Sequence, residues 1–182
     1  MITLPFQIRL SEASATPWKN GGGVTRELLA WPSVSDWAIR VSVADVESDG
    51  PFSAFSGVER YFAVLEGEGV ELEGVGAIRA GDSPVKFEGD TARNCRLFNG
   101  PTRDLNVMIR RERGHGFLRD HVIGGDSVNS SKPQLCGTFT WPEGLLVCNS
   151  GENSPTSSLS LSTRPGTRVF QFAFWSHKLE QS

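Results

Sequence analysis

The sequence has few cysteines, and none of them is placed in a pairing motif. Cys95, Cys136 and Cys148 are three in number, so they cannot all pair within one chain, and no C-x-x-C spacing occurs. Cys136 and Cys148 each follow an apolar residue, which is typical of a buried free thiol in a reducing cytoplasm. We therefore expect three free thiols and a cytoplasmic protein.

Long apolar runs and an excess of positive charge are also missing. No run of about 18 apolar residues occurs, and the first residues lack the basic and apolar regions of a secretory signal. The 18 Lys and Arg are outnumbered by 21 Asp and Glu, so no overall positive field would attract nucleic acid. The sequence predicts a monomer or homodimer with neither nucleic acid nor membrane as a partner.

Helical periodicity is nearly absent as well. The single helical candidate is a short turn at residues 11–15, with Ser11 as a possible N-cap, and it ends before Pro17. Period-two alternation recurs instead, as in residues 37–44, where Trp37 begins one face and Ala38 the other. That pattern is typical of a half-buried strand. Further strands are expected at residues 70–73, 104–110, 145–149, 159–161 and 168–175.

Turn residues separate these short strands throughout the chain. The 20 glycines and 10 prolines favour an all-β sandwich or barrel, with Trp37 and Phe62 in its core. Residues 119–134 are polar and contain a glycine pair, so they are expected to be a connecting loop. The prediction is a first unit at 1–118 and a second, degenerate unit at 135–182 that completes its fold with other segments of the chain. Whether the two arose by duplication is left open.

The segment from Gly50 to Gly74 contains Val-Leu-Glu-Gly-Glu-Gly, which resembles the first cupin motif, and Ala80-Gly81-Asp82 resembles the second. This resemblance implies a cupin-like double-stranded β-helix, or jelly roll. Arg60 lies where the family's metal-binding glutamate would be, and the histidine positions hold other residues. His115, His121 and His177 lie outside both motifs. We therefore expect no metal and no cofactor, because a metal needs three or four ligands.

Arg60 changes what such a barrel could bind. A guanidinium in place of a metal-binding carboxylate favours an anionic ligand, since Arg holds a carboxylate through two parallel hydrogen bonds. Two alternatives stay open: a structural pair with an acid such as Asp104, and a solvated arginine beside Glu59.

A second unusual segment runs from Trp18 to Glu27 and contains three consecutive glycines. Glycines permit positive φ and expose backbone N–H groups, so Gly21–Gly23 could bind an anion. No Walker loop is present. The alternative is a glycine-rich β-bulge or connection.

Three blocks together, WKNGGG-x-T-x-E, G-x-F-S-x-F-x-G-x-x-R with V-L-E-G-x-G, and D-x-N-x-M-x-R, resemble the HutD/Ves family between about Pro17 and Arg111. The resemblance implies two fused cupin-like barrels (a bicupin) without a metal site, and a role in restraining histidine utilisation. It implies a ligand site of Trp18, Lys19, Asn20, Gly21, Gly22, Thr25, Glu27, Arg60 and Asn106. Asp104, Asn106 and Arg110 alternate on one strand face and could equally form a structural polar ladder.

The leading hypothesis is a binding protein for a small anionic metabolite, with N-formylglutamate or urocanate as candidates by family association. The alternative is a metal-independent cupin enzyme such as an isomerase or epimerase, for which Glu27 and Asp104 are the available acid and base. A third possibility is a structural module whose interior is filled by apolar side chains.

Overall fold

The computed structural model describes residues 1–120, 132–151 and 165–177. Within these ranges the chain is all-β, and its only helix is the single 3-10 turn η1 (Leu10–Glu12). The strands are β1 (Phe6–Arg9), β2 (Ala15–Pro17), β3 (Gly23–Trp31), β4 (Ile39–Val46), β5 (Gly50–Phe52), β6 (Val58–Glu66), β7 (Val70–Leu72), β8 (Gly76–Ile78), β9 (Val85–Glu88), β10 (Arg93–Leu97), β11 (Thr102–Arg110), β12 (Gly114–Asp120), β13 (Leu135–Trp141), β14 (Leu145–Asn149) and β15 (Arg168–Ser176). No helix in the described ranges is long and apolar enough to cross a membrane.

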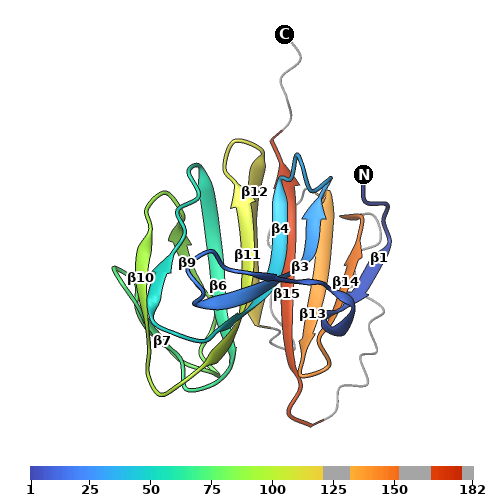
Figure 1. Cartoon of the computed structure of the whole chain (residues 1–182). Helices are drawn as coiled ribbons and strands as arrows, with labels where there is room; N and C mark the ends of the chain where they lie inside the picture. Colours follow the sequence, from blue (N-terminus) through green and yellow to red (C-terminus); the bar gives the residue numbers. More distant parts are fainter. Residues whose placement is uncertain (121–131, 152–164, 178–182) are drawn as a thin grey trace.

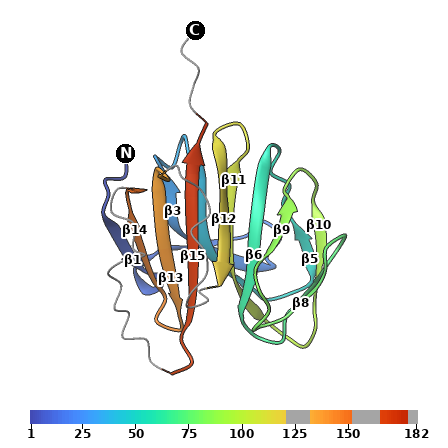
Figure 2. The same cartoon turned by 180° about the vertical axis from the view of Figure 1, so that it is seen from behind.

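The strands form three sheets. The central sheet has six strands in the order β2-β3-β4-β11-β6-β9. A four-stranded sheet, β5-β10-β7-β8, and a five-stranded sheet, β1-β14-β13-β15-β12, lie on opposite sides of it (Figures 1 and 2). We call the layer between the central and four-stranded sheets the first interior, and the layer between the central and five-stranded sheets the second interior.

The two interiors differ in chemistry. The second is a large apolar core in which Val41, Val107 and Tyr61 of the central sheet meet Phe139 and Phe170 of the five-stranded sheet. The first holds a smaller apolar cluster that includes Phe52, Phe62, Phe87 and Cys95. Buried polar side chains are concentrated beside this smaller cluster, on the faces of the central strands that point into the first interior: Ser42, Arg60, Thr102, Asp104 and Asn106.

The middle strands of the central sheet are buried on both faces, which corrects the expectation of a half-buried strand at residues 37–44. Val41 and Val43 face the second interior, while Ser42 and Ala44 are buried on the other face. The physical reason is that a sheet placed between two others has no solvent side. Trp37, at 8% exposure, and Phe62, at 0%, are core residues as predicted.

The other strand predictions vary in outcome. Residues 145–149 and 168–175 do form strands, whereas residues 159–161 lie outside the described ranges. The expected helical turn begins one residue earlier than predicted, at Leu10, where the backbone N–H of Arg9 donates to Glu12 Oε2 at 2.8 Å. Ala15 belongs to a strand instead, because Ala15 to Pro17 pair with β3.

The proposed connection at residues 119–134 falls mostly on residues 121–131, which lie outside the described ranges. The strands on either side of it, β12 and β13, both pair with β15. At the other end of the same sheet, β1 pairs with β14. The five-stranded sheet is thus built from both ends of the chain.

The glycines of the Val-Leu-Glu-Gly-Glu-Gly motif are required by close backbone approach. Gly67 has φ of +93°, and a Cβ there would lie 2.6 Å from the carbonyl oxygen of Pro101. Gly69 has φ of +113°, and its Cβ would collide with the carbonyl oxygen of Ile78. Only glycine meets both conditions, so the turn after β6 can lie against the strands beside it.

Candidate functional site

Arg60 points into the first interior, as its position in the motif predicted. It lies on β6 between Met108 of β11 and Phe87 of β9, and only 5% of the residue is exposed. Its Cζ atom is 5.3 Å from the ring centre of Phe52, 5.9 Å from Phe55 and 5.2 Å from Phe87. The aromatic rings stabilise the charge by cation–π attraction. A solvated arginine beside Glu59 is therefore the wrong interpretation.

Arg60 is joined to Asp104 through Asn106. Arg60 Nη2 donates to Asn106 Oδ1 at 2.8 Å, and Asn106 Nδ2 donates to Asp104 Oδ1 at 2.5 Å. Asn106 and Asp104 alternate on β11, so both side chains face the first interior. These two hydrogen bonds link the buried Arg60 cation to the buried Asp104 carboxyl group through Asn106, with no direct hydrogen bond between Arg60 and Asp104.

Burial dominates the electrostatics of this chain. Asp104 is fully buried, and burial raises the pKa of its carboxyl to about 8 against the opposing effects of the Arg60 charge and the Asn106 hydrogen bond. Burial likewise lowers the pKa of Arg60 to about 10; Asp104 opposes this shift, and the charges of Arg40 and Arg93 add to it. Both groups thus lie in an environment that disfavours charge.

Arg40 and Arg93 were missed by the sequence reasoning. Arg40 Cζ lies 5.0 Å from the ring centre of Phe55, its Nη2 donates to Met108 Sδ at 3.1 Å, and burial lowers its pKa. Arg93 Cζ lies 5.5 Å from the ring centre of Phe87, and its Nη1 donates to the Glu73 carbonyl oxygen at 2.9 Å. The available signal was that the face of residues 37–44 that begins with Ala38 carries only small side chains besides Arg40.

Several polar atoms of the first interior have no hydrogen-bond partner. Within the described ranges, the buried side-chain atoms without one are Arg40 Nε, Arg60 Nε, Arg93 Nε, Thr102 Oγ1, Asp104 Oδ2 and Thr138 Oγ1. All but Thr138, which lies on the five-stranded sheet, belong to residues of the first interior or its rim. Buried polar groups in folded proteins almost always have partners, so this concentration of unpaired atoms distinguishes the first interior from the rest of the described chain.

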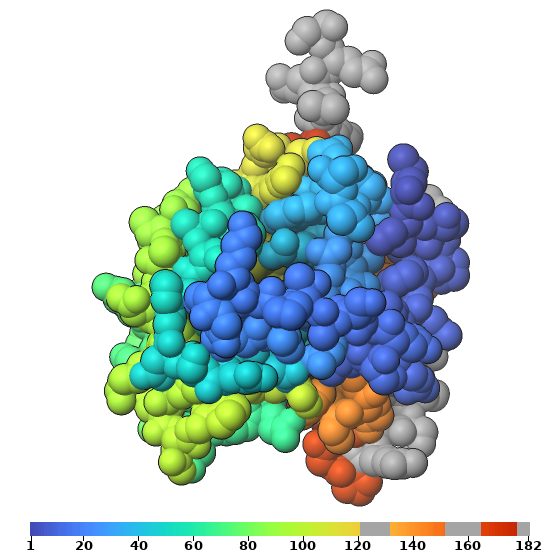
Figure 3. All heavy atoms as spheres, in the orientation of Figure 1, coloured from blue at the N-terminus to red at the C-terminus, as the bar shows by residue number. Residues whose placement is uncertain are grey.

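Trp18 and Thr25 join the site from the glycine-rich segment. The indole Nε1–H of Trp18 donates to Thr25 Oγ1 at 2.7 Å, and the Trp18 ring packs edge-on against Phe52 at 6.0 Å. Phe52 in turn is one of the rings around Arg60. The turn before β3 therefore contacts the guanidinium indirectly, through one aromatic side chain. Figure 3 shows the N-terminal residues, in blue, spread across this face of the molecule.

The rest of the glycine-rich segment forms a turn. The N–H of Gly21 donates to the Trp18 carbonyl oxygen at 3.0 Å, and the N–H of Gly22 donates to Asn20 Oδ1 at 3.0 Å. These donors are satisfied within the turn, as the alternative of a glycine-rich connection expects. Lys19 is exposed at the tip of the turn.

Glu27 is exposed on β3 opposite Ser42, and its charge raises the pKa of Arg40. Glu27 therefore lies at the rim of the first interior, and its charge acts on Arg40 more strongly than on Arg60. Arg110 turns away from the Asp104–Asn106 pair: its Cζ lies 4.6 Å from the ring centre of Trp37 and its Nη1 is 4.0 Å from Asp36 Oδ1.

Potential metal ligands do not gather in the described part of the chain. No group of three His, Cys, Asp or Glu side chains there could hold a metal ion. His115 and His177 have ring centres 5.8 Å apart on the outer surface beside Trp175, and His121 lies outside the described ranges.

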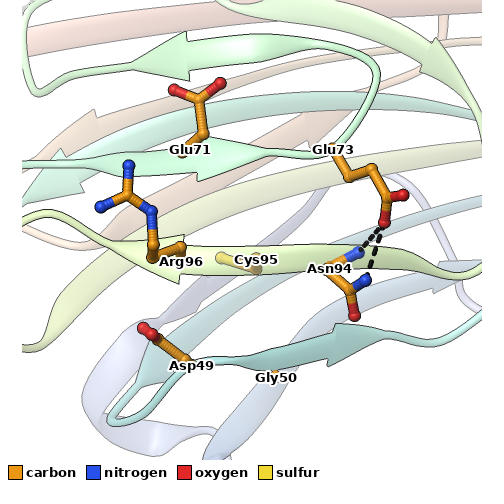
Figure 4. Close-up of a pocket in the computed structure, with 7 residues that line it drawn as sticks. All are labelled: Asp49, Gly50, Glu71, Glu73, Asn94, Cys95 and Arg96. Carbon is orange, nitrogen blue, oxygen red and sulfur yellow. Dashed lines mark hydrogen bonds between the residues drawn. The ribbon is translucent and has the colours of Figure 1, made fainter.

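A hollow of about 480 Å³ lies at the four-stranded sheet (Figure 4). It is lined by Asp49, Gly50, Glu71, Glu73, Asn94, Cys95 and Arg96. Glu73 Oε2 accepts two hydrogen bonds from Asn94, so part of its acidic lining is already paired. None of the predicted site residues lines this hollow.

Comparison with known protein families shows which family the chain belongs to. The model of the HutD family matches residues 10–161, which is most of the chain. The chain belongs to the HutD family. The family has a cupin fold, and Arg60 lies at the position where the resemblance to the first cupin motif would put a metal-binding glutamate.

Curated relatives of this HutD-family chain match over part of its length. Protein Ves of Citrobacter koseri is 42% identical over 107 residues, which are 56% of this chain and 56% of that protein. An uncharacterized 21.2 kDa protein in the hutC 3' region of Pseudomonas putida is 33% identical over 117 residues, 62% of each chain. The chain thus spans 56% to 62% of the length of these relatives.

Solved structures share the whole fold. HutD from Pseudomonas fluorescens SBW25 superposes with a TM-score of 0.73 at 24% identity, covering 94% of this chain and 98% of that one. A conserved protein of unknown function from Pseudomonas aeruginosa PAO1 gives a TM-score of 0.69 at 23% identity, covering 95% and 94%. Protein Ylba from E. coli gives 0.58 at 7% identity, covering 96% and 92%.

Proposed function

We propose that this HutD-family protein binds a small carboxylate at Arg60 in its first interior and acts as a binding protein in histidine utilisation. The observation that carries the proposal is the group of buried polar atoms without partners around Arg60. An anion among them would accept the hydrogen bonds that the arginines leave unmade.

The balance of charge supports an anionic ligand. Three guanidinium groups, Arg40, Arg60 and Arg93, influence one another here, and each of the other two lowers the pKa of Arg60. Asp104 is the fully buried acid beside them, and its raised pKa means that it supplies little negative charge near neutral pH. A carboxylate at Arg60 would relieve the repulsion among the three cations, with Trp18, Thr25 and Asn106 beside it.

The place in metabolism rests on the relatives. The Pseudomonas putida relative is named for its position beside hutC, and the family carries the HutD description. N-formylglutamate and urocanate are therefore the metabolites to test first. Their charged carboxylates fit the proposed contact with Arg60.

We also infer that the two interiors correspond to two cupin-like barrels that share the central sheet. The support is that the four-stranded and five-stranded sheets each pack a separate apolar cluster against it. The second interior is lined by apolar side chains, which leaves the first as the ligand site.

The alternative, a metal-independent isomerase or epimerase, has one observation in its favour. The pKa of Asp104, about 8, suits a general acid or base near neutral pH. A second proton-transfer group would be needed, and Glu27 is exposed at the rim. Turnover of a bound metabolite that is lost in Asp104→Asn would favour the enzyme over the binding protein.

The proposal is tested by a thermal-shift screen of small carboxylates, followed by titration calorimetry of those that stabilise the protein. Arg60→Ala is expected to weaken carboxylate binding by about thirtyfold or more, because removal of one partner of a buried charged hydrogen bond typically costs about 2 to 5 kcal/mol. Arg60→Lys is expected to lose part of the affinity, since an ammonium group cannot reproduce the planar fork.

Arg79→Ala is the matched control. Arg79 also lies over an aromatic ring, with Cζ 4.4 Å from the centre of Phe98, but it is exposed. Its removal should leave the affinity unchanged. A carboxylate that binds equally well to wild type and Arg60→Ala would show that the site is elsewhere.

A further inference from the structure

We propose that Asp104 carries a proton on its Oδ2 atom whenever an anion is bound at Arg60, so that the bound anion, and not Asp104, is the negative partner of the guanidinium. This inference rests on the proposed function and adds a proton to its binding equilibrium. At a pH where the free protein holds Asp104 ionised, the proton comes from the solvent and is released again when the anion leaves.

The geometry of Asp104 separates its two oxygens. Oδ1 accepts the hydrogen bond from Asn106 Nδ2 at 2.5 Å, whereas Oδ2 is buried with no partner in the described part of the chain. An ionised carboxylate in that position would bury a negative charge on an unbonded oxygen, which is costly. A proton on Oδ2 removes that charge and leaves the bond at Oδ1 intact.

Arg60 is the group that resists protonation of Asp104. Its positive charge is the main influence that favours the ionised carboxylate, followed by the hydrogen bond from Asn106. An anion held by Arg60 would offset that charge and add a negative charge of its own nearby. Both effects favour the neutral form of Asp104.

The surrounding ionisable groups do not supply a substitute for Arg60. The charges that act on Asp104 or on Arg60 belong to Arg40 and Asp45 on β4, Arg93 and Cys95 on β10, and these two residues themselves, while Glu27 on β3 acts on Arg40. Asp45 raises the pKa of Asp104, as an anion would, and it is itself held ionised by Arg26 and Arg103 from the opposite face of the sheet. The Cys95 thiol stays neutral, because burial raises its pKa to about 12.

The consequence is a pH-dependent affinity. Below the pKa of Asp104, about 8, the proton is already in place and anion binding is insensitive to pH. Above this pKa, anion binding requires the uptake of a proton, and the proton concentration falls as the pH rises. The Kd should therefore rise by up to about tenfold per pH unit.

The test uses acetate as the probe and the full-length protein. Acetate binding is followed by NMR titration between about pH 6 and 9, a range in which acetate stays ionised. The wild-type Kd is expected to be flat at the lower end and to rise above about pH 8. Asp104→Asn, which mimics the neutral carboxyl, should bind acetate with a pH-independent Kd near the low-pH value of the wild type. Asp36→Asn is the control: Asp36 is an exposed acid paired with Arg113, so its removal should leave the wild-type pH dependence unchanged.

Different results would overturn different claims. Failure of acetate to bind the wild type at any pH would remove the site at Arg60, and this inference with it. Acetate binding whose pH dependence persists in Asp104→Asn would assign the titration to another group, such as Arg60, and overturn only the inference. Should the variant not fold, the carboxyl ¹³C titration of Asp104 in the wild type decides: a midpoint that saturating acetate does not raise contradicts proton uptake.

Discussion

At the scale of single residues, Asp104 makes folding stability depend on pH. Its folded pKa of about 8 lies above the ordinary value near 4, so between these values the folded state holds a proton that the unfolded state has lost. The free energy of unfolding should therefore fall as the pH rises through this window, by at most about 1.4 kcal/mol per pH unit. Asp36, Asp45 and Asp90 have lowered pKa values, so their contributions are lost only under more acid conditions.

Asp104→Asn should remove this decline. Urea denaturation of both proteins at a series of pH values between about 5 and 8 measures it, and the variant should give the flatter profile. If both profiles have the same slope, the proton responsible lies on another residue.

The sequence predicted individual residues of the site unevenly. Arg60 was located by counting within a motif, because the cupin turn fixes which way that strand position points. Arg40 was not recognised, because alternation at residues 37–44 shows that two faces differ but not which one is covered. Arg93 has no motif of its own, and only the pairing of β10 with β5 brings it to the interior.

At the scale of elements, the β2–β3 turn depends on which glycine is replaced. Gly21 has φ of +72° with open space around it, so Gly21→Ala should cost about 1 to 2 kcal/mol from backbone strain alone. An added Cβ at Gly23 would collide with the carbonyl oxygen of Asp45, so Gly23→Ala must move β3 away from β4. Chemical denaturation should therefore find Gly23→Ala clearly the less stable of the two variants. Equal losses would mean that the shift of β3 costs no more than the backbone strain at Gly21.

Trp18 offers a second test of the same turn. Trp18→Phe keeps a ring near Phe52 but removes the hydrogen bond that the indole N–H donates to Thr25 Oγ1. The loss of this bond should lower the free energy of unfolding by about 1 kcal/mol. Trp18→Ala should cost more, because it also removes the aromatic contact. Thermal or urea denaturation of the two variants measures the difference. A Trp18→Phe variant as unstable as Trp18→Ala would show that the hydrogen bond dominates.

Element types were predictable, but their partners were not. Period-two alternation identified the strands at residues 70–73 and 104–110, because a strand's side chains must alternate whatever it packs against. The pairing of β1 with β14 joins residues far apart in sequence, and no local pattern carries that information. The placement of the strands into three sheets therefore had to come from the structure.

At the scale of the whole molecule, the two interiors should lose their structure together. Phe62 fills the first interior and Phe139 the second, and both are fully buried. Truncation of either to Ala should cost about 3 to 5 kcal/mol. Since both interiors depend on the central sheet, each variant should still unfold in one transition, with coincident fluorescence and circular dichroism curves. Two separate transitions would show that the halves fold independently.

The position of the central sheet between two others also sets how far the sequence can vary. In β6, six consecutive residues from Arg60 to Leu65 are buried. Successive side chains therefore pack into different interiors, and none of them faces water. A strand on an ordinary surface sheet accepts changes at every second position. Here a saturation-mutagenesis profile should record an unbroken block of intolerant sites along β6 and β11, one set selected for apolar packing and the interleaved set for the site around Arg60.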